Sequence, residues 1–140
     1  MVAMLGSTEV DGKKIVDLIE EGKITKERIN QIVDRTKKGG AEIVKYLEKG
    51  SAFYAPAASG VEMAECYLKN LKKQLPCAVY LDGEYGTKDI YAGVPVIIGS
   101  GGVEKIIELE LSSQERENFE KSIEAVRDLF NAAKKIDSTL

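Results

Sequence analysis

The amino-acid sequence predicts an α+β fold in which antiparallel strands are flanked by long helices. Apolar residues recur at helical spacing over residues 25–48 and 52–71, and the period then changes to the alternation of strands between residues 77 and 111. A helix start signal follows at residue 112. Because strands and helices do not alternate as they do in βαβ units, the pattern favours α+β over a doubly wound fold.

The first two dozen residues predict short elements joined by turns. Val2–Leu5 and Thr8–Val10 have extended character and lead to Asp11-Gly12, which is a turn signal. Asp17–Glu21 has room for one helical turn, which Gly22 would stop.

A long helix is predicted from Thr25 to about Glu48. Thr25 is the expected N-cap, and Ile24 with Ile29 can form a hydrophobic staple across it. Gly40 falls on the apolar stripe of this helix, which predicts a close approach by another backbone or by a ligand. The stripe consists of Ile29, Ile32, Val33, Thr36, Gly40, Ile43, Val44 and Leu47.

Gly50 is expected to end that helix, and a second helix is predicted from about Ala52 to Leu71. Pro56 is compatible with it only in the first turn or two, where the missing N–H costs least. The first half of this helix carries the small residues Ala57, Ala58, Ser59 and Gly60.

Three strands are expected next, at Cys77–Leu81, Asp89–Gly99 and Val103–Leu111, with Pro95 near a sheet edge or a bulge. In the third strand Ile107, Leu109 and Leu111 would face the core, and Glu108 and Glu110 would face water. Ser112 to Glu115 forms a capping box that opens the last helix. Its apolar stripe is Phe119, Ile123, Val126, Phe130 and Ala133.

The composition excludes several classes of function. A net charge of −3 without a basic stripe argues against nucleic-acid binding. The chain has no histidine, so no imidazole of its own can transfer a proton. Cys66 and Cys77 lack metal-ligand spacing and are expected as reduced, buried thiols, which together with the lack of a membrane span or signal peptide indicates a cytoplasmic protein.

Other candidate sites have simpler explanations. Gly99–Gly102 is a hairpin turn without the helix N-terminus that a phosphate loop requires. Glu62 and Glu65 share a solvated helix face, and Glu84–Gly86 meets the needs of a turn. No nucleophile, base and orienting group are brought together by spacing.

Several segments together resemble the C-terminal domain of the lactate/malate dehydrogenase family, most closely malate dehydrogenases of lactate-dehydrogenase-like type from bacteria. The segments are GGAEIV, GSAFYAPAAS, LPCAVYL, DGEYG, TKDIYAGVPVIIG and GGVEKIIELEL, and the resemblance covers essentially the whole chain. It implies an α+β substrate domain that follows an NAD-binding Rossmann domain in the complete enzyme.

The resemblance also implies site residues. Gly39 and Gly40 would line the floor of the substrate site, and Ser51 and Ala52 would lie beside the substrate. Pro56 would take the apolar position against the nicotinamide of the cofactor, NAD. No metal is implied.

The family's catalytic histidine, its partner aspartate, the arginine that clamps the substrate carboxylate and the NAD-binding domain have no counterparts in residues 1–140. We therefore expect a partial C-terminal substrate domain of an NAD-dependent malate dehydrogenase. It would interconvert malate and oxaloacetate only in the complete enzyme, and alone would be inactive and bind no NAD. The expected partners are that NAD-binding domain and further copies of the chain, with neither nucleic acid nor membrane. The alternative is a non-catalytic oligomerisation module derived from the same domain.

Overall fold

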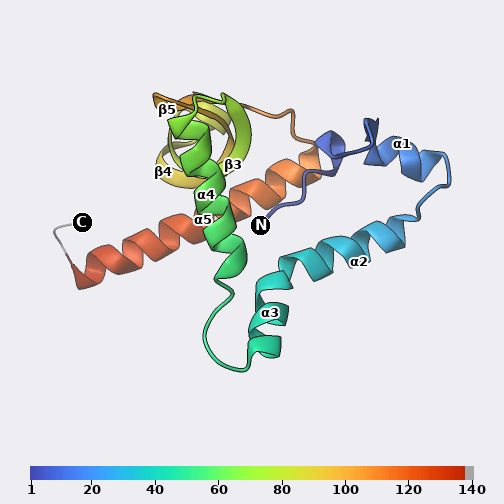
Figure 1. Ribbon diagram of the computed structural model, residues 1–140, viewed down its shortest axis with the longest axis horizontal. Coiled ribbons are helices and arrows are strands. Elements are labelled where there is room, and N and C mark those ends of the chain that lie inside the picture. Colours follow the sequence, from blue (N-terminus) through green and yellow to red (C-terminus); the bar gives the residue numbers. More distant parts are fainter. Residues whose placement is uncertain (138–140) are drawn as a thin grey trace. The chain divides into compact units, whose positions relative to one another are not determined.

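A computed structural model describes residues 1–137 of the chain (Figure 1), and these divide into two compact units, residues 1–58 and 59 onward. Helix α4 (Tyr54–Leu68) begins in the first unit and continues into the second. The antiparallel sheets and helices confirm the predicted α+β class.

Unit 1 begins with small elements, of which the turn at Asp11-Gly12 was predicted, whereas the expected extended segment Val2–Leu5 is not a strand. A 3-10 turn, η1 (Leu5–Ser7), leads to a two-stranded antiparallel hairpin of β1 (Glu9–Val10) and β2 (Lys13–Lys14). Asp11 and Gly12 join the two strands with positive φ angles of 51° and 77°, as a tight hairpin requires. Helix α1 (Ile15–Glu20) follows and stops before Gly22, whose φ is also positive.

The helix expected from Thr25 to Glu48 is two helices, α2 (Lys26–Lys37) and α3 (Gly39–Leu47), and the single-helix prediction is wrong. Figure 1 shows the chain changing direction between them. Lys38 separates them with non-helical angles (φ −97°, ψ 1°), just before the two glycines, each of which costs a helix about 1 kcal/mol relative to alanine. The N-cap is as predicted, since the Thr25 hydroxyl accepts a hydrogen bond from the Arg28 amide at 3.1 Å.

Within the described residues no other backbone approaches Gly40, so that part of the prediction is wrong, while the close approach of a ligand stays a prediction. Gly40 is exposed, and a Cβ added there would meet no atom within 4 Å. The break at Lys38 restarts the helical phase, so the stripe of α2 does not continue onto α3.

Helix α4 is shorter than the predicted Ala52–Leu71 helix, and Pro56 lies in its first turn as expected. It ends in a Schellman motif, in which the Leu71 amide donates to the Cys66 carbonyl (3.0 Å) and the Asn70 amide to the Tyr67 carbonyl (3.3 Å). Asn70 takes the left-handed conformation that this cap needs, with φ 49°. The preceding helix likewise ends earlier than expected, at Leu47, so Gly50 is not its cap.

Unit 2 is built on a three-stranded antiparallel sheet in the order β3-β4-β5, from β3 (Lys73–Asp82), β4 (Lys88–Gly99) and β5 (Gly102–Ile106). Pro95 lies on the central strand, opposite Pro76 and just beyond the last pair of β4 with β5. The Ile107 amide donates to the Pro95 carbonyl at 2.8 Å, but proline has no N–H with which to extend the ladder. The third strand therefore ends at Ile106, short of the predicted Leu111.

A short 3-10 turn, η2 (Glu84–Gly86), makes hydrogen bonds to the segment that follows β5. The buried Tyr85 hydroxyl donates to the Ile107 carbonyl (2.7 Å) and accepts from the Leu109 amide (3.0 Å), while the Tyr85 amide donates to the Glu108 carboxylate (2.6 Å). This segment is not a strand, but the predicted alternation of burial is present. Ile107, Leu109 and Leu111 are half-buried, whereas Glu108 and Glu110 are exposed.

The core of unit 2 lies on one face of the sheet. Alternate residues of β3 and β4 are buried there with Cys66 of α4 and with Phe119 and Ile123 of α5 (Ser113–Ile136). The capping box between Ser112 and Glu115 is present as predicted, but Val126 and Phe130, farther along the stripe, are exposed. The buried set is Cys66, Leu75, Cys77, Leu81, Tyr85, Ile90, Ala92, Val94, Val96, Ile98, Phe119 and Ile123.

Candidate functional site

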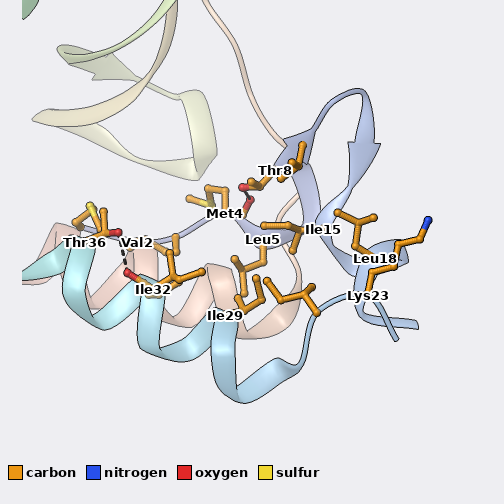
Figure 2. A pocket seen from close by; sticks show the side chains of 15 residues that line it. Val2, Met4, Leu5, Thr8, Ile15, Leu18, Lys23, Ile29, Ile32 and Thr36 are labelled. Carbon is orange, nitrogen blue, oxygen red and sulfur yellow. Dashed lines mark hydrogen bonds between the residues drawn. The ribbon is translucent and has the colours of Figure 1, made fainter. Parts of the chain in front are cut away.

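Unit 1 holds an open apolar cavity of about 610 Å³ between η1, the hairpin, α1 and α2 (Figure 2). Twelve of its fifteen lining residues are apolar. Figure 2 shows Met4, Leu5, Ile15, Ile29 and Ile32 converging on this space from η1, α1 and α2.

The stripe of α2 gives the cavity one wall. Thr25 caps the helix, and the residues spaced behind it, Ile29, Ile32, Val33 and Thr36, all line the cavity. Ile24, at the other side of the cap, lines it as well. The sequence pattern identified these residues as one face, but it could not indicate that the face borders an open space.

The three polar side chains that line the cavity already have hydrogen-bond or ion-pair partners. Thr8 donates to the Met4 carbonyl (2.6 Å) and Thr36 to the Ile32 carbonyl (2.8 Å). The Lys23 ammonium points away from the apolar residues in Figure 2 and pairs with Glu21, whose carboxylate raises the pKa of Lys23. The cavity is thus suited to apolar material and offers no acid, base or nucleophile.

The five site residues that the family resemblance implies lie on another part of unit 1. Gly39 and Gly40 open helix α3, Ser51 and Ala52 lie in the α3–α4 connection, and Pro56 occupies the first turn of α4. Gly39 and Ala52 are half-buried, and the other three are exposed. None of the five lines the apolar cavity.

Local interactions shape the segments that carry these residues. Across the break between α2 and α3, the Arg35 guanidinium donates two hydrogen bonds to the Glu42 carboxylate, at 2.9 and 3.1 Å. This contact lowers the pKa of Glu42 and raises that of Arg35. Glu48 and Gly50 turn the chain with positive φ angles, and the Phe53 and Tyr54 rings, 4.7 Å apart, stand largely exposed before Pro56.

The site surface lacks the groups for chemistry of its own. Glycine, alanine and proline bring no titratable side chain, Ser51 brings only a hydroxyl, and the chain has no histidine to serve as acid or base. Across residues 1–137, no group of three or more histidine, cysteine or carboxylate side chains is placed to hold a metal ion. These small residues can shape a surface and let a ligand approach closely, but they bring no acid or base.

The charged and thiol residues of unit 2 have structural explanations. Glu62 pairs with Lys73 and Glu65 with Lys69, and these exposed pairs fit the solvated face that was predicted. Cys66 and Cys77 are free, buried thiols in the core, and burial followed by the proximity of Cys66 raises the pKa of Cys77. The Gly99–Gly102 segment forms the β4–β5 hairpin turn, as expected. No helix among the described residues is long and apolar enough to cross a membrane.

Comparison with protein families gives a match over residues 1–136 to the lactate/malate dehydrogenase, alpha/beta C-terminal domain. The malate dehydrogenase of Pelagibacter ubique (strain HTCC1062) is 61% identical over all 140 residues, and that of Cereibacter sphaeroides (strain ATCC 17029 / ATH 2.4.9) is 51% identical. Both alignments cover 100% of this chain and 44% of the relative. The chain therefore spans less than half the length of the curated relatives it matches.

Solved structures agree with this match. Malate dehydrogenase from Salinibacter ruber superposes with a TM-score of 0.90 at 40% identity, covering 99% of this chain and 44% of that one. Lactate dehydrogenase from Eimeria maxima with NADH and oxamate superposes with a TM-score of 0.92 at 40% identity, covering 96% of this chain and 42% of that one.

Proposed function

This chain belongs to the lactate/malate dehydrogenase family as its α/β C-terminal domain, and on that premise we propose that it is the substrate-domain portion of an NAD-dependent malate dehydrogenase. The complete enzyme would pass hydride between the nicotinamide of NAD and the carbon that carries the hydroxyl group in malate and the carbonyl oxygen in oxaloacetate. The remaining portion of the enzyme, including the NAD-binding domain, would supply the histidine acid/base, its aspartate partner and the arginine carboxylate clamp.

One observation carries the choice of malate as substrate. The identity of 61% to the Pelagibacter ubique malate dehydrogenase extends over the whole chain. Further curated malate dehydrogenases match the whole chain at 50–51% identity, whereas solved structures that are 40–45% identical to this chain include both malate and lactate dehydrogenases.

Within that enzyme, the proposed role of this chain is to shape the site. The absence of side chains at Gly39 and Gly40 would let substrate lie close to the start of α3, and Ser51 and Ala52 would flank it. Pro56 would present an apolar, rigid surface to the nicotinamide. The exposure of Gly40, Ser51 and Pro56 supports these roles, because a surface that meets a ligand or another domain has to be accessible before it is covered.

A chimera tests the proposed function. The part of the Pelagibacter ubique malate dehydrogenase outside the aligned region is fused to this chain, and NADH oxidation is followed with oxaloacetate and with pyruvate. We expect the chimera to reduce oxaloacetate with the higher kcat/KM and the 140-residue chain alone to show no turnover. General acid/base catalysis alone contributes about 10²–10⁴-fold, and the chain has no histidine. A folded chimera that reduces neither substrate, or that prefers pyruvate, would contradict the proposal.

Substitutions in the same chimera test the site residues. Gly40→Val should lower kcat/KM for oxaloacetate by tenfold or more. Its effect on the stability of the chain alone should be small, because the space around Gly40 is open there. Pro56→Asn should raise the KM for NADH more than the KM for oxaloacetate. Ala58→Asn, also exposed near the start of α4, is the matched control and should change neither. Unchanged kinetics for Gly40→Val would remove α3 from the proposed site.

A second candidate is a non-catalytic oligomerisation module. It is favoured by exposed apolar side chains on α3 and α4, which include Val44, Leu47, Val61 and Leu68. Exposed large apolar side chains are typical of interfaces when they gather into a patch. Light scattering over a hundredfold concentration range would detect dimers or larger oligomers, and Val61→Lys should reduce them. A chain that associates while the chimera stays inactive favours the module, whereas a monomeric chain rules it out.

A further inference from the structure

The sheet of unit 2 has a free edge along its long strand β3. Among the described residues β3 pairs only with β4, and β5 lies on the other side of β4. The Pro95 carbonyl accepts from the Ile107 amide on the β5 side, so the backbone groups of Pro95 point away from β3. Pro76 is the antiparallel partner of Pro95, and its backbone groups therefore point away from β4, toward the free edge.

Every second residue of β3 shares this direction, so the amides and carbonyls of Gln74, Ala78 and Tyr80 also face the free edge. Within residues 1–137, no group accepts a hydrogen bond from these three amides across that edge. At the end of the strand the Asp82 amide donates to the Glu84 carboxylate at 2.8 Å. A strand edge with unpaired backbone groups is a template for a further strand.

The sequence of β3 is complementary to its own reverse about Ala78. If Ala78 lies opposite Ala78 of a second, antiparallel copy, Tyr80 lies opposite Pro76. The Tyr80 amide would then donate to the Pro76 carbonyl, and the Tyr80 ring, 45% exposed, would pack on the proline ring. Gln74 lies opposite Asp82 in the same register, where the side-chain amide would donate to an exposed carboxylate. All these side chains are on the exposed face of the sheet, so they meet without disturbing the core.

The buried face of β3 is self-complementary in the same register. Leu75 lies opposite Leu81, and Cys77 lies opposite Val79. All four are apolar, and Val79 is only half-buried in one copy, so pairing would extend the core across the edge and cover this side chain. A register with Pro76 opposite itself has no N–H on either strand at that position and is disfavoured.

From these observations we propose that β3 is an interface for a second copy of this chain. Two copies pair antiparallel through β3 about Ala78 and join their three-stranded sheets into one continuous sheet. Because both copies use the same edge, the pairing closes at the dimer and leaves no β3 edge free. Pro76 disfavours other registers of the pair. The interface involves neither the exposed apolar residues of α3 and α4 nor the proposed enzymatic role.

Disulfide trapping in the 140-residue chain tests the register. Ala78→Cys places two thiols at the two-fold axis, where opposite Cα atoms lie about 5.5 Å apart, within disulfide range. Gly93→Cys is the matched control, because Gly93 is the exposed β4 partner of Ala78 and has open space for a side chain. Its two copies would lie about 14 Å apart, at three strand spacings. Under mild oxidation, Ala78→Cys should form cross-linked dimers at least tenfold faster. The parent chain, with Cys66 and Cys77 buried, gives the background.

Two measurements test the same edge without a new thiol. Ala78→Lys puts like charges opposite each other and should raise the dissociation constant of the dimer at least tenfold in sedimentation equilibrium, whereas Gly93→Lys should not change it. In the parent chain, the Ala78 and Tyr80 amides should exchange with solvent more slowly as the chain concentration rises, because pairing gives them acceptors. Nuclear magnetic resonance resolves these amides individually.

Other outcomes would overturn the proposal. A chain that stays monomeric at the highest concentration has no such interface. A dimer that Val61→Lys abolishes and Ala78→Lys leaves intact associates through α3 and α4 instead. Equal cross-linking of Ala78→Cys and Gly93→Cys would mean that the sheets meet face to face, and exchange of the Ala78 and Tyr80 amides that does not depend on concentration would exclude strand pairing. None of these outcomes bears on oxaloacetate reduction by the chimera, so the two proposals fail separately.

Discussion

The two units of this chain bury very different amounts of apolar surface. Unit 2 closes a core of twelve buried residues beneath a three-stranded sheet, with Leu81 and Val96 fully inaccessible. Unit 1 has comparable apolar patterning along α2 and α3 but buries only Ile29. The contrast shows that amphipathic helices identify faces to be covered, and that only a second layer turns such a face into a core.

The difference has a topological cause. In unit 2, β3 and β4 pair over ten positions, and this broad face accepts side chains from α4 and α5. In unit 1 the hairpin is two residues long on each strand and cannot form a layer against α2. Two-stranded hairpins of this size are marginal without other packing.

Hydrogen exchange should give the largest separation between the units. Amides of β3 and β4 should open only with global unfolding, whereas those of α2 and α3 should open locally at low cost. With a global stability of about 5–15 kcal/mol, we expect protection factors in β3 and β4 at least ~10³-fold higher. Mass spectrometry of exchanged peptides measures this. Equal protection in α2 and β4 would show that the two units fold as one.

Core truncations should follow the same division. Leu81→Ala removes a fully buried side chain and should lower the free energy of unfolding by about 2–5 kcal/mol in urea titrations. Ile29→Ala should leave the unfolding transition of unit 2 unchanged, because its cost is confined to unit 1. Leu68→Ala, at a position 79% exposed, is the control and should stay within about 0.5 kcal/mol of the parent. A larger decrease in the free energy of unfolding for Ile29→Ala than for Leu81→Ala would contradict this difference between the two units.

Tyr85→Phe should weaken unit 2 by about 1–3 kcal/mol, because the Ile107 carbonyl and the Leu109 amide would lose their partner. Tyr91→Phe is the matched control, since Tyr91 is 65% exposed. Thermal unfolding by circular dichroism compares the two. Equal melting temperatures for both variants would mean that the hydroxyl of Tyr85 is dispensable.

Alanine substitutions at Gly99 and Gly40 should change the stability by smaller amounts and in opposite directions. A Cβ at Gly99 would approach Glu104 Cδ within 2.7 Å and Asn70 Oδ1 within 2.8 Å, displacing the amide that accepts from Ser100. Gly99→Ala should therefore destabilise unit 2 by about 0.5–1.5 kcal/mol. Gly40→Ala meets open space and should stabilise α3 by up to about 1 kcal/mol. Urea midpoints that move in the same direction would refute this assignment.

The smallest effect concerns Cys77. Burial raises its pKa in the folded state, so folding favours the protonated thiol. This contribution is fully present below the ordinary thiol pKa of about 8.5 and is lost as the pH rises through the raised value. The stability difference between the parent and Cys77→Ala should thus narrow between neutral pH and pH 10. A difference that stays constant over this range would show that Cys77 does not titrate during unfolding.

Features that depend on neighbours along the chain were predictable. The Thr25 cap, the Ser112–Glu115 capping box and the Asp11-Gly12 turn each need only a few adjacent residues to form their hydrogen bonds. Pro56 was correctly expected in the first turn of a helix. For the same reason the α+β class followed from the change of apolar period alone.

Features that depend on residues far apart in the sequence could not be predicted. The third strand ends at Ile106 because Pro95, on another strand, lacks an N–H, and because Tyr85 binds the chain that follows. The two helices at Lys38 read as one because the apolar spacing continues across Gly39 and Gly40. Apart from Gly40, which the apolar stripe singled out, the proposed site residues were inferred from the family resemblance, and the described contacts would not select them.

By itself the sequence determined the family, the class of fold and the ends of several elements, because motifs and caps are written in consecutive residues. The tertiary structure alone decided which apolar faces become a core. Ile123 of α5 and Ile32 of α2 each lie on the apolar stripe of their helix, yet Ile123 is buried and Ile32 is 43% exposed. Burial is a property of two surfaces, and a sequence pattern describes only one of them.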